Sequence, residues 1–279
     1  MLQVSSALKG YAIAAKDGAI GTISDILFDQ TTWTVRWLVV DTGTWLTGRL
    51  VLIHPSAAGH VDHEQRQIDV ALTRKQVEDS PDIRQDRPVS QQMQSDLYGY
   101  YGWDPYWNNG ISGAGSFGSG LYADGLFGGG MGGIGGVTGL AIRERPSYPG
   151  LPGGGDGQAL DDGQALDDGD PNLRSTKEIT GYHVHASDGS IGHVEDVLLD
   201  DQGWAIQYLA VDTSNWWVGQ HVLISPHAIT GIDWSDRSIE LSVTRDRVKT
   251  SPAWDRTNNI DGTFGRRLHE HYDWPNYIF

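Results

Sequence analysis

The sequence contains no cysteine among its 279 residues. This absence excludes disulfide bonds, thiol-based catalysis and zinc sites built on thiolates. Long apolar runs are also missing, because no stretch approaches the roughly 18 residues that a membrane-spanning helix needs. The N-terminal segment lacks the basic and apolar regions of a secretory signal. We therefore expect a soluble, cytoplasmic protein without integral membrane insertion.

Basic residues are scarce relative to acidic ones. Lys and Arg number 20 against 36 Asp and Glu, which leaves a formal net charge of -16. Binding to the phosphate backbone depends on cationic side chains that release counterions, so nucleic acid is not expected as a partner. The same charge disfavours an anionic lipid surface.

The chain contains two copies of one unit. The stretch DGAIGTISDILFDQTTW at Asp17–Trp33 returns as DGSIGHVEDVLLDDQGW at Asp188–Trp204. The same constant shift aligns Gly10–Pro81 with Gly181–Pro252 without a gap, and 30 of these 72 positions are identical. Each unit is long enough to bury a core of its own, so we predict two domains rather than a solenoid.

Short strands dominate the pattern inside each unit. Asp17-Gly18 and Asp188-Gly189 favour two-residue hairpin turns whose central residues take positive φ. Residues 33–40 alternate with a period of two and become apolar on both faces near their end, which predicts a central strand. Residues 68–72 form one last row with alternate side chains directed inward. A short helix at 73–77 and a second at about 90–100 should follow.

The pattern Gly-Tyr, Asp-Gly-x-Ile-Gly-x-x-x-Asp-x-Leu-x-Asp, Trp and Leu-x-Val-Asp-Thr resembles the PRC-barrel family, named after the cytoplasmic domain of the photosynthetic reaction centre H subunit. The resemblance covers both units, Leu8 to about Trp107 and Ile179–Phe279. It implies a small all-β barrel that serves as an adaptor surface without chemistry of its own. The tails after the barrels are similar to those of soluble bacterial members of the family.

The expected fold is mainly β, with two small PRC-type barrels, each carrying a short C-terminal helical extension. We predict a first domain at 1–107, a linker at 108–177 that is largely disordered, and a second domain at 178–279. Glycine fills 14 positions of Gly110–Gly139, almost half of that segment, and Pro152–Leu173 holds six Asp but no Lys or Arg. This composition is typical of a flexible linker, although a glycine-aromatic segment that docks on a partner remains an alternative. The Asp spacing does not match a calcium loop.

Repeated carboxylates and histidines are the residues that could carry chemistry. Because the carboxylates fall near strand ends, we interpret them as turn and cap residues; with the hairpin positions the set is Asp17, Gly18, Asp41, Asp188, Gly189 and Asp212. His183 and His185 would share one face of a strand, and a metal site with His193, Glu195 and His221 is left open. Solvated histidines are favoured, because the first copy has no histidine at these positions. No cofactor is expected.

Exposed aromatic side chains are the main candidates for partner binding, because large aromatics anchor many protein interfaces. They lie in the loop between two strands of each unit and in the tails, where packing on the barrel itself is the alternative. The candidates are Trp45, Tyr101, Trp103, Trp107, Trp216, Trp217 and Trp274.

The sequence therefore predicts a non-enzymatic adaptor or scaffold that binds a protein partner, with its two barrels paired as a pseudo-dimer. Association with further copies of the chain is left open. A peripheral regulator of a membrane electron-transfer complex is the alternative that the family name implies. A metal- or acid-dependent hydrolase ranks behind both, because no nucleophile elbow, phosphate loop or dinucleotide fingerprint is present.

Overall fold

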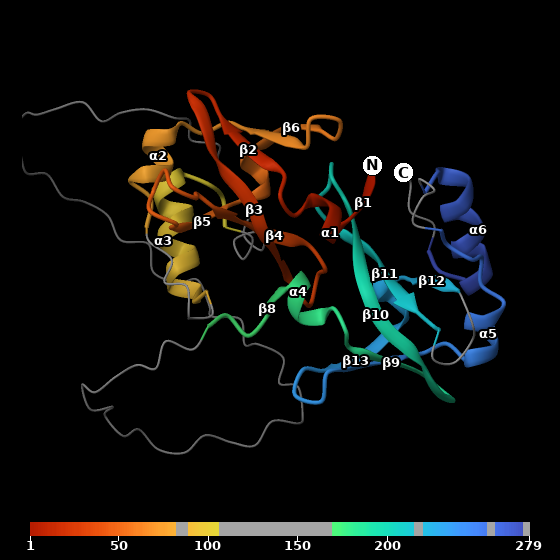
Figure 1. The fold of residues 1–279 in the computed structure, drawn as a ribbon. Helices are drawn as coiled ribbons and strands as arrows, with labels where there is room; N and C mark the ends of the chain where they lie inside the picture. The colour runs from red at the N-terminus through yellow and green to blue at the C-terminus, as the bar shows by residue number, and fades with distance from the viewer. Residues whose placement is uncertain (82–88, 106–168, 215–219, 256–259, 276–279) are drawn as a thin grey trace, which may run out of the picture. The chain divides into compact units, whose positions relative to one another are not determined.

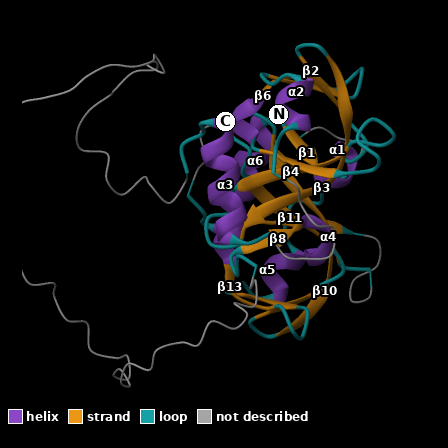
Figure 2. Ribbon diagram, turned by 90° about the vertical axis from the view of Figure 1, so that its left-hand side faces the viewer, coloured by secondary structure: helices purple, strands orange, loops and turns teal. Residues whose placement is uncertain are grey.

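The computed structural model describes residues 1–81, 89–105, 169–214, 220–255 and 260–275. All of them belong to one compact unit, formed by Met1–Pro105 together with Asp167–Phe279. Strands account for more of the described residues than helices do, and the helices are short (Figure 2). No described helix has the length and apolar character needed to cross a membrane.

The two halves of the chain contain the same succession of elements. The first half consists of β1 (Leu2–Val4), α1 (Ser5–Leu8), β2 (Ala12–Ala15), β3 (Gly18–Asp29), β4 (Val35–Asp41), β5 (Leu50–Ile53), the 3-10 helix η1 (Pro55–Ala57), β6 (Ala58–Asp62), β7 (Gln67–Val70), α2 (Arg74–Glu78) and α3 (Gln91–Tyr101). The second half consists of β8 (Leu173–Ser175), α4 (Thr176–Ile179), β9 (His183–Ala186), β10 (Gly189–Asp200), β11 (Ile206–Asp212), β12 (His221–Ile224), η3 (Pro226–Ala228), β13 (Ile229–Asp233), β14 (Ser238–Leu241), α5 (Arg245–Lys249) and α6 (Gly262–Tyr272).

Each half contributes six strands, in the same order, to a seven-stranded sheet. The first runs β5-β4-β3-β2-β7-β6 and the second β12-β11-β10-β9-β14-β13, each with one further strand beside β3 or β10 (Figure 1). The β2–β7 and β9–β14 pairs are parallel, whereas β3–β4, β10–β11 and the remaining pairs of described strands are antiparallel. The predicted fold class, mainly β with two β domains, is confirmed.

Strand β4 is central, as its two apolar faces predicted. It pairs with β3 on one side and with β5 on the other. Leu38 and Val40 point into the core of the sheet, whereas Trp37 lies on the opposite face, where α3 covers it. The Trp37 ring lies 5.3 Å from the ring of Tyr98 on α3. The predicted helix at 90–100 is therefore α3, which begins after the N-cap Ser90.

The first hairpin differs from the prediction by one residue. Ala15 pairs with Gly18, so Lys16 and Asp17 form the centre of the turn and Gly18 begins β3. Gly18 alone of these takes positive φ, at 139°. The Asp-Gly pair was expected at the centre because this dipeptide suits a turn with two left-handed residues. Here the glycine instead supplies the one unusual backbone angle beside the turn.

A three-residue strand that precedes each barrel pairs with the other barrel. Strand β1 lies antiparallel to β10, with Leu2 opposite Asp200. Strand β8 lies antiparallel to β3, with Leu173 opposite Asp29. Residues 173–177 were expected at the end of the linker, but they form β8 and the start of α4. The reason is tertiary, because three residues form a strand only where a neighbouring strand offers its edge.

Candidate binding grooves where the two repeats meet

A pair of reciprocal backbone hydrogen bonds joins the two repeats. Val35 donates its N–H to the carbonyl of Trp204 and Ile206 donates to the carbonyl of Trp33, each at 2.7 Å. Between them Thr34 and Ala205, which occupy equivalent positions of the repeats, form an isolated bridge. The contact is thus made by the same backbone positions from both sides, which is the pattern of an isologous interface.

Both tryptophans at this junction adopt a backbone conformation that is uncommon for bulky residues. Trp33 has φ of 57° and Trp204 has φ of 52°. Outside glycine, left-handed φ is rare and costs about 1 kcal/mol or more. Both residues nevertheless hold it where their carbonyls accept the bonds from the other repeat. The alternating pattern around Trp33 predicted only a strand residue and gave no sign of this role.

Two aspartates anchor the exchanged segments. Asp196 on β10 accepts hydrogen bonds from the Ser5 hydroxyl at 2.7 Å and from the Ser6 hydroxyl. Asp25 on β3 accepts from the Ser175 hydroxyl at 2.6 Å and from the Thr176 hydroxyl at 3.3 Å. Each carboxylate therefore binds the segment that the other repeat supplies. Neither contact could be predicted from the spacing of these residues in the sequence.

A further network crosses the junction on one side only. His63 lies 2.6 Å through Nε2 from the Asp201 carboxylate and 3.2 Å through Nδ1 from the Tyr11 hydroxyl. Burial acts to raise the pKa of Asp201, but hydrogen bonds from the Met1 ammonium group and from His63 outweigh it and lower this pKa. The second repeat has Trp234 at the position of His63, and there the Arg174 guanidinium lies 4.3 Å above the indole ring.

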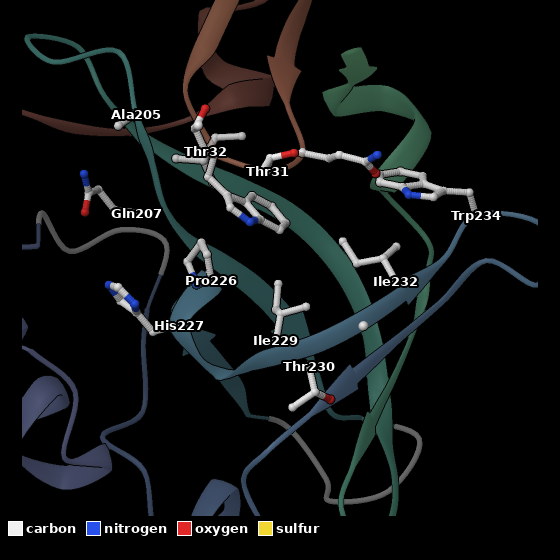
Figure 3. A pocket seen from close by; sticks show the side chains of 14 residues that line it. Thr31, Thr32, Ala205, Gln207, Pro226, His227, Ile229, Thr230, Ile232 and Trp234 are labelled. Carbon is white, nitrogen blue, oxygen red and sulfur yellow. The ribbon is translucent and has the colours of Figure 1, made fainter. Parts of the chain in front are cut away.

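Two grooves flank the junction at equivalent positions. The larger, of about 660 Å³, lies between the β3–β4 turn of the first repeat and the β11 start, η3 and β13 of the second (Figure 3). The smaller, of about 440 Å³, lies between the matching segments with the roles of the repeats reversed. The larger groove is lined by Gln30, Thr31, Thr32, Trp33, Ala205, Ile206, Gln207, Pro226, His227, Ile229, Thr230, Gly231, Ile232 and Trp234.

The two grooves differ in the charge of the residues that line them. The larger one includes no Asp, Glu, Lys or Arg and is walled by apolar side chains, hydroxyl and amide groups and His227. The smaller one contains Arg36, Asp201 and His54, and it has Ala58 and Gly59 where the larger has Ile229 and Thr230. The duplication has therefore produced one uncharged groove and one charged groove from the same backbone positions.

His54, which lines the smaller groove, is surrounded by aromatic side chains. Its ring lies 5.5 Å from Trp37, 5.3 Å from Tyr98 and 5.6 Å from Trp103. Nδ1 accepts the backbone N–H of Ser56 at 3.2 Å. Burial, and to a smaller extent the charge of Arg36, lowers the pKa of His54 to about 4. The imidazole is therefore neutral near pH 7.

The aromatic candidates from the sequence occupy two kinds of place. Tyr101 and Trp103 stack on each other with ring centroids 4.2 Å apart and are half-buried against the first barrel. Trp274 is likewise half-buried against the second barrel. Trp45 is half-buried beneath the Arg74 guanidinium, which lies 4.4 Å from its ring. Trp107, Trp216 and Trp217 lie outside the described residues. Partner binding through these residues stays a prediction.

The aspartates singled out as turn and cap residues accept backbone N–H groups. Asp17 and Asp188 accept from Arg74 and Arg245, each at 2.7 Å, and so tie the first hairpin of each repeat to its short helix. Two more aspartates accept from the residue two positions later at 2.8 Å; they are Asp41, bonded to Gly43, and Asp212, bonded to Ser214. Gly189, like Gly18, has φ of 139°.

Two histidines of the second repeat lie beside carboxylates. His221 lies 2.9 Å from the Glu195 carboxylate, and His193 lies 3.8 Å from that of Asp212. His183 is opposite His193 on the neighbouring strand, and His185 follows on the same strand. Within the described part of the chain, no three such groups are placed to hold a metal ion.

Comparison with known proteins identifies the first repeat. Residues 5–77 match the PRC-barrel domain family. An uncharacterized protein of Deinococcus radiodurans is 36% identical over 74 residues, which is 26% of this chain and 26% of that protein. The PRC-barrel family is generally non-enzymatic, and its fold suits a protein-interaction module. The chain therefore carries a PRC-barrel domain in its first repeat, and the second repeat, which shares the strand order and the aligned sequence pattern, is a second domain of this fold.

Proposed function

We propose that this protein is a non-enzymatic scaffold that binds a protein partner, and that its two barrels act as the intramolecular counterpart of a dimer. In this proposal the domains are 1–107 and 178–279 and residues 108–177 link them, with β8 near the end of the linker paired to the first barrel. The observation that carries the proposal is the reciprocal pairing of β1 with β10 and of β8 with β3. Because each barrel takes an edge strand from the other, separation would leave two strand edges uncovered.

The pairing is tested in the intact chain by a protease site inserted between residues 139 and 140. After cleavage, the two halves should elute together in size-exclusion chromatography at neutral pH, because strands, core and hydrogen bonds still join them. An uncleaved sample is the control for elution volume. Halves that separate at micromolar concentration while keeping their circular dichroism spectrum would refute the pairing.

The partner is tested by crosslinking and affinity capture from native cells. We expect the intact protein to enrich one partner that is lost with the triple variant Trp45→Ala, Trp216→Ala and Trp217→Ala, whose fold is checked first. Equal capture by both proteins would show that these tryptophans are not the binding surface. Enrichment of a membrane electron-transfer complex would favour the alternative function, and cell fractionation tests the cytoplasmic location that we include in the proposal.

A further inference from the structure

We propose that the larger groove binds an extended, basic segment of a partner protein, which adds a strand to the open edge of β13. This inference rests on the proposed function, because it names the kind of segment that the scaffold recognises. Adding a strand to a sheet edge is a general mode of peptide recognition, in which backbone hydrogen bonds supply affinity and pockets for alternate side chains supply specificity.

The first support is the position of β13 at the end of its sheet. Ile232 pairs with Ile239 and Asp233 with Ser238 on β14, and no described residue pairs with the opposite edge of β13. This strand contains no proline or lysine of the kind that protects many edge strands. Its five residues span roughly 17 Å, enough to pair with about five residues of an added strand.

The second support is the groove that runs along this edge. Ile229 and Ile232 project from β13 into it, and Thr31 and Thr32 lie across from them (Figure 3). Both isoleucines are only half-buried in the free protein, so a bound apolar side chain would cover surface that water now contacts. The volume of about 660 Å³ lies within the range of roughly 300–1,000 Å³ that is usual for binding pockets.

Two tryptophans are already held in place along the groove. Trp33 stacks on Phe28 with a centroid distance of 5.3 Å, and Trp234 is fixed by the guanidinium of Arg174. A rigid aromatic side chain loses little conformational entropy when a ligand packs on it, which makes it an effective anchor. The groove therefore offers anchors at the β3–β4 turn and at the end of β13.

Charge decides the composition of the added segment. The groove lining carries no Asp, Glu, Lys or Arg, so the residues within it should be uncharged. Beside it Asp233 at the end of β13 and Glu240, opposite Gly231 on β14, are exposed carboxylates, whereas the Arg174 guanidinium above Trp234 is paired with Glu178 at 3.6 Å. The whole chain has a net charge of -16. Lys or Arg next to the apolar residues of the segment would complement this charge.

The smaller groove provides an internal comparison. Its edge strand β6 presents Ala58 and Gly59 in place of Ile229 and Thr230, and His63 stands at the position of Trp234. His63 contacts the buried carboxylate of Asp201 at 2.6 Å. This groove lacks the apolar wall and the second tryptophan, so the extended segment is expected at the larger groove alone.

The experiment selects peptides on the full-length protein from a phage-displayed library of random twelve-residue sequences. Enriched peptides should share apolar residues at alternate positions next to Lys or Arg, and synthetic copies should protect the β13 amides from hydrogen exchange. The test variant carries Ile229→Ala, Thr230→Gly and Trp234→His, which introduce the residues that the first repeat has at the equivalent positions, and it should weaken binding about tenfold or more. Gln202→Ala, which changes an exposed residue of the smaller groove, is the control and should bind as the unmodified protein does.

Three results would overturn the inference: no peptide enriched above background, enriched peptides without basic residues, or equal binding by the triple variant. A concentration-dependent dimer that the triple variant abolishes would assign the groove to a second copy of the chain instead. These results leave the scaffold itself standing if the cleaved halves remain together and a partner is still captured. Halves that separate would instead remove the proposed function.

Discussion

Replacement of Asp196 by alanine tests how the exchanged segment is held. The carboxylate is 2% exposed and accepts hydrogen bonds from the hydroxyls of Ser5 and Ser6 and from the Val197 N–H at 2.8 Å. Hydrogen bonds to a charged group contribute about 1.5–3 kcal/mol each, and they are not additive within one cluster. Ser5 is 1% exposed, so its hydroxyl would also be left buried without this acceptor.

We therefore expect Asp196→Ala to lower the free energy of unfolding by about 3 kcal/mol. Urea denaturation followed by tryptophan fluorescence measures this loss. Asp196→Asn keeps one carbonyl oxygen as an acceptor and should lose less. Asp25→Ala removes the equivalent group, whose side chain is 16% exposed, and should also cost less. A loss below about 0.5 kcal/mol for Asp196→Ala, the usual range of surface substitutions, would refute the argument that this carboxylate anchors the segment.

Three further substitutions test the geometry and electrostatics of the barrels. The pKa of His54 is lowered to about 4 in the folded protein, so as the pH falls the unfolded chain becomes protonated at this histidine before the folded chain does. The free energy of unfolding should therefore fall by about 2–3 kcal/mol between pH 6.5 and pH 4. His54→Ser, which introduces the residue of the second repeat, should reduce this loss in urea titrations at each pH. Because the pKa of Asp201 is lowered in the folded protein, its carboxylate stabilises the fold above about pH 4, and this stabilisation is lost as the pH falls through the folded pKa. Asp201→Asn should therefore flatten the dependence of unfolding free energy on pH in that acid range. An unchanged dependence would contradict the assignment. Gly192→Ala would place a Cβ 1.9 Å from a backbone carbonyl oxygen of β11, at φ of 147°. It should lower the free energy of unfolding by about 1–3 kcal/mol, measured as a lower midpoint of thermal unfolding. Gly231→Ala, with open space around the added Cβ, is the matched control, and equal effects of the two substitutions would refute the close approach.

Local chemistry made the barrels predictable. The central position of β4 followed from its two apolar faces, and the inward row of Ile68, Val70 and Leu72 followed from a period of two. The helices at Arg74–Glu78 and Gln91–Tyr101 lie within one residue of the predicted 73–77 and 90–100. These features depend on neighbours within a few residues, so a single sequence contains the information that they need.

The candidate site was less accessible to the same reasoning. Trp33 looked like a strand residue, yet its carbonyl joins the two repeats, and His63 carried no motif although it contacts Asp201. One signal was available: the shift that relates the repeats continues upstream of Gly10 and matches Leu2 with Leu173 and Leu8 with Ile179. That continuity indicates that the segments before the barrels belong to the repeat.

The sequence by itself determined the duplication, the strand pattern of each barrel and the scarcity of groups that could carry catalysis. Only the tertiary structure decided that β1 and β8 lie on the opposite repeat, and that the junction is flanked by one uncharged and one charged groove. The physical reason is that periodicity records which face of a strand is buried but not which strand lies beside it. Partners as distant in the chain as Asp29 and Leu173 meet only when both barrels are folded.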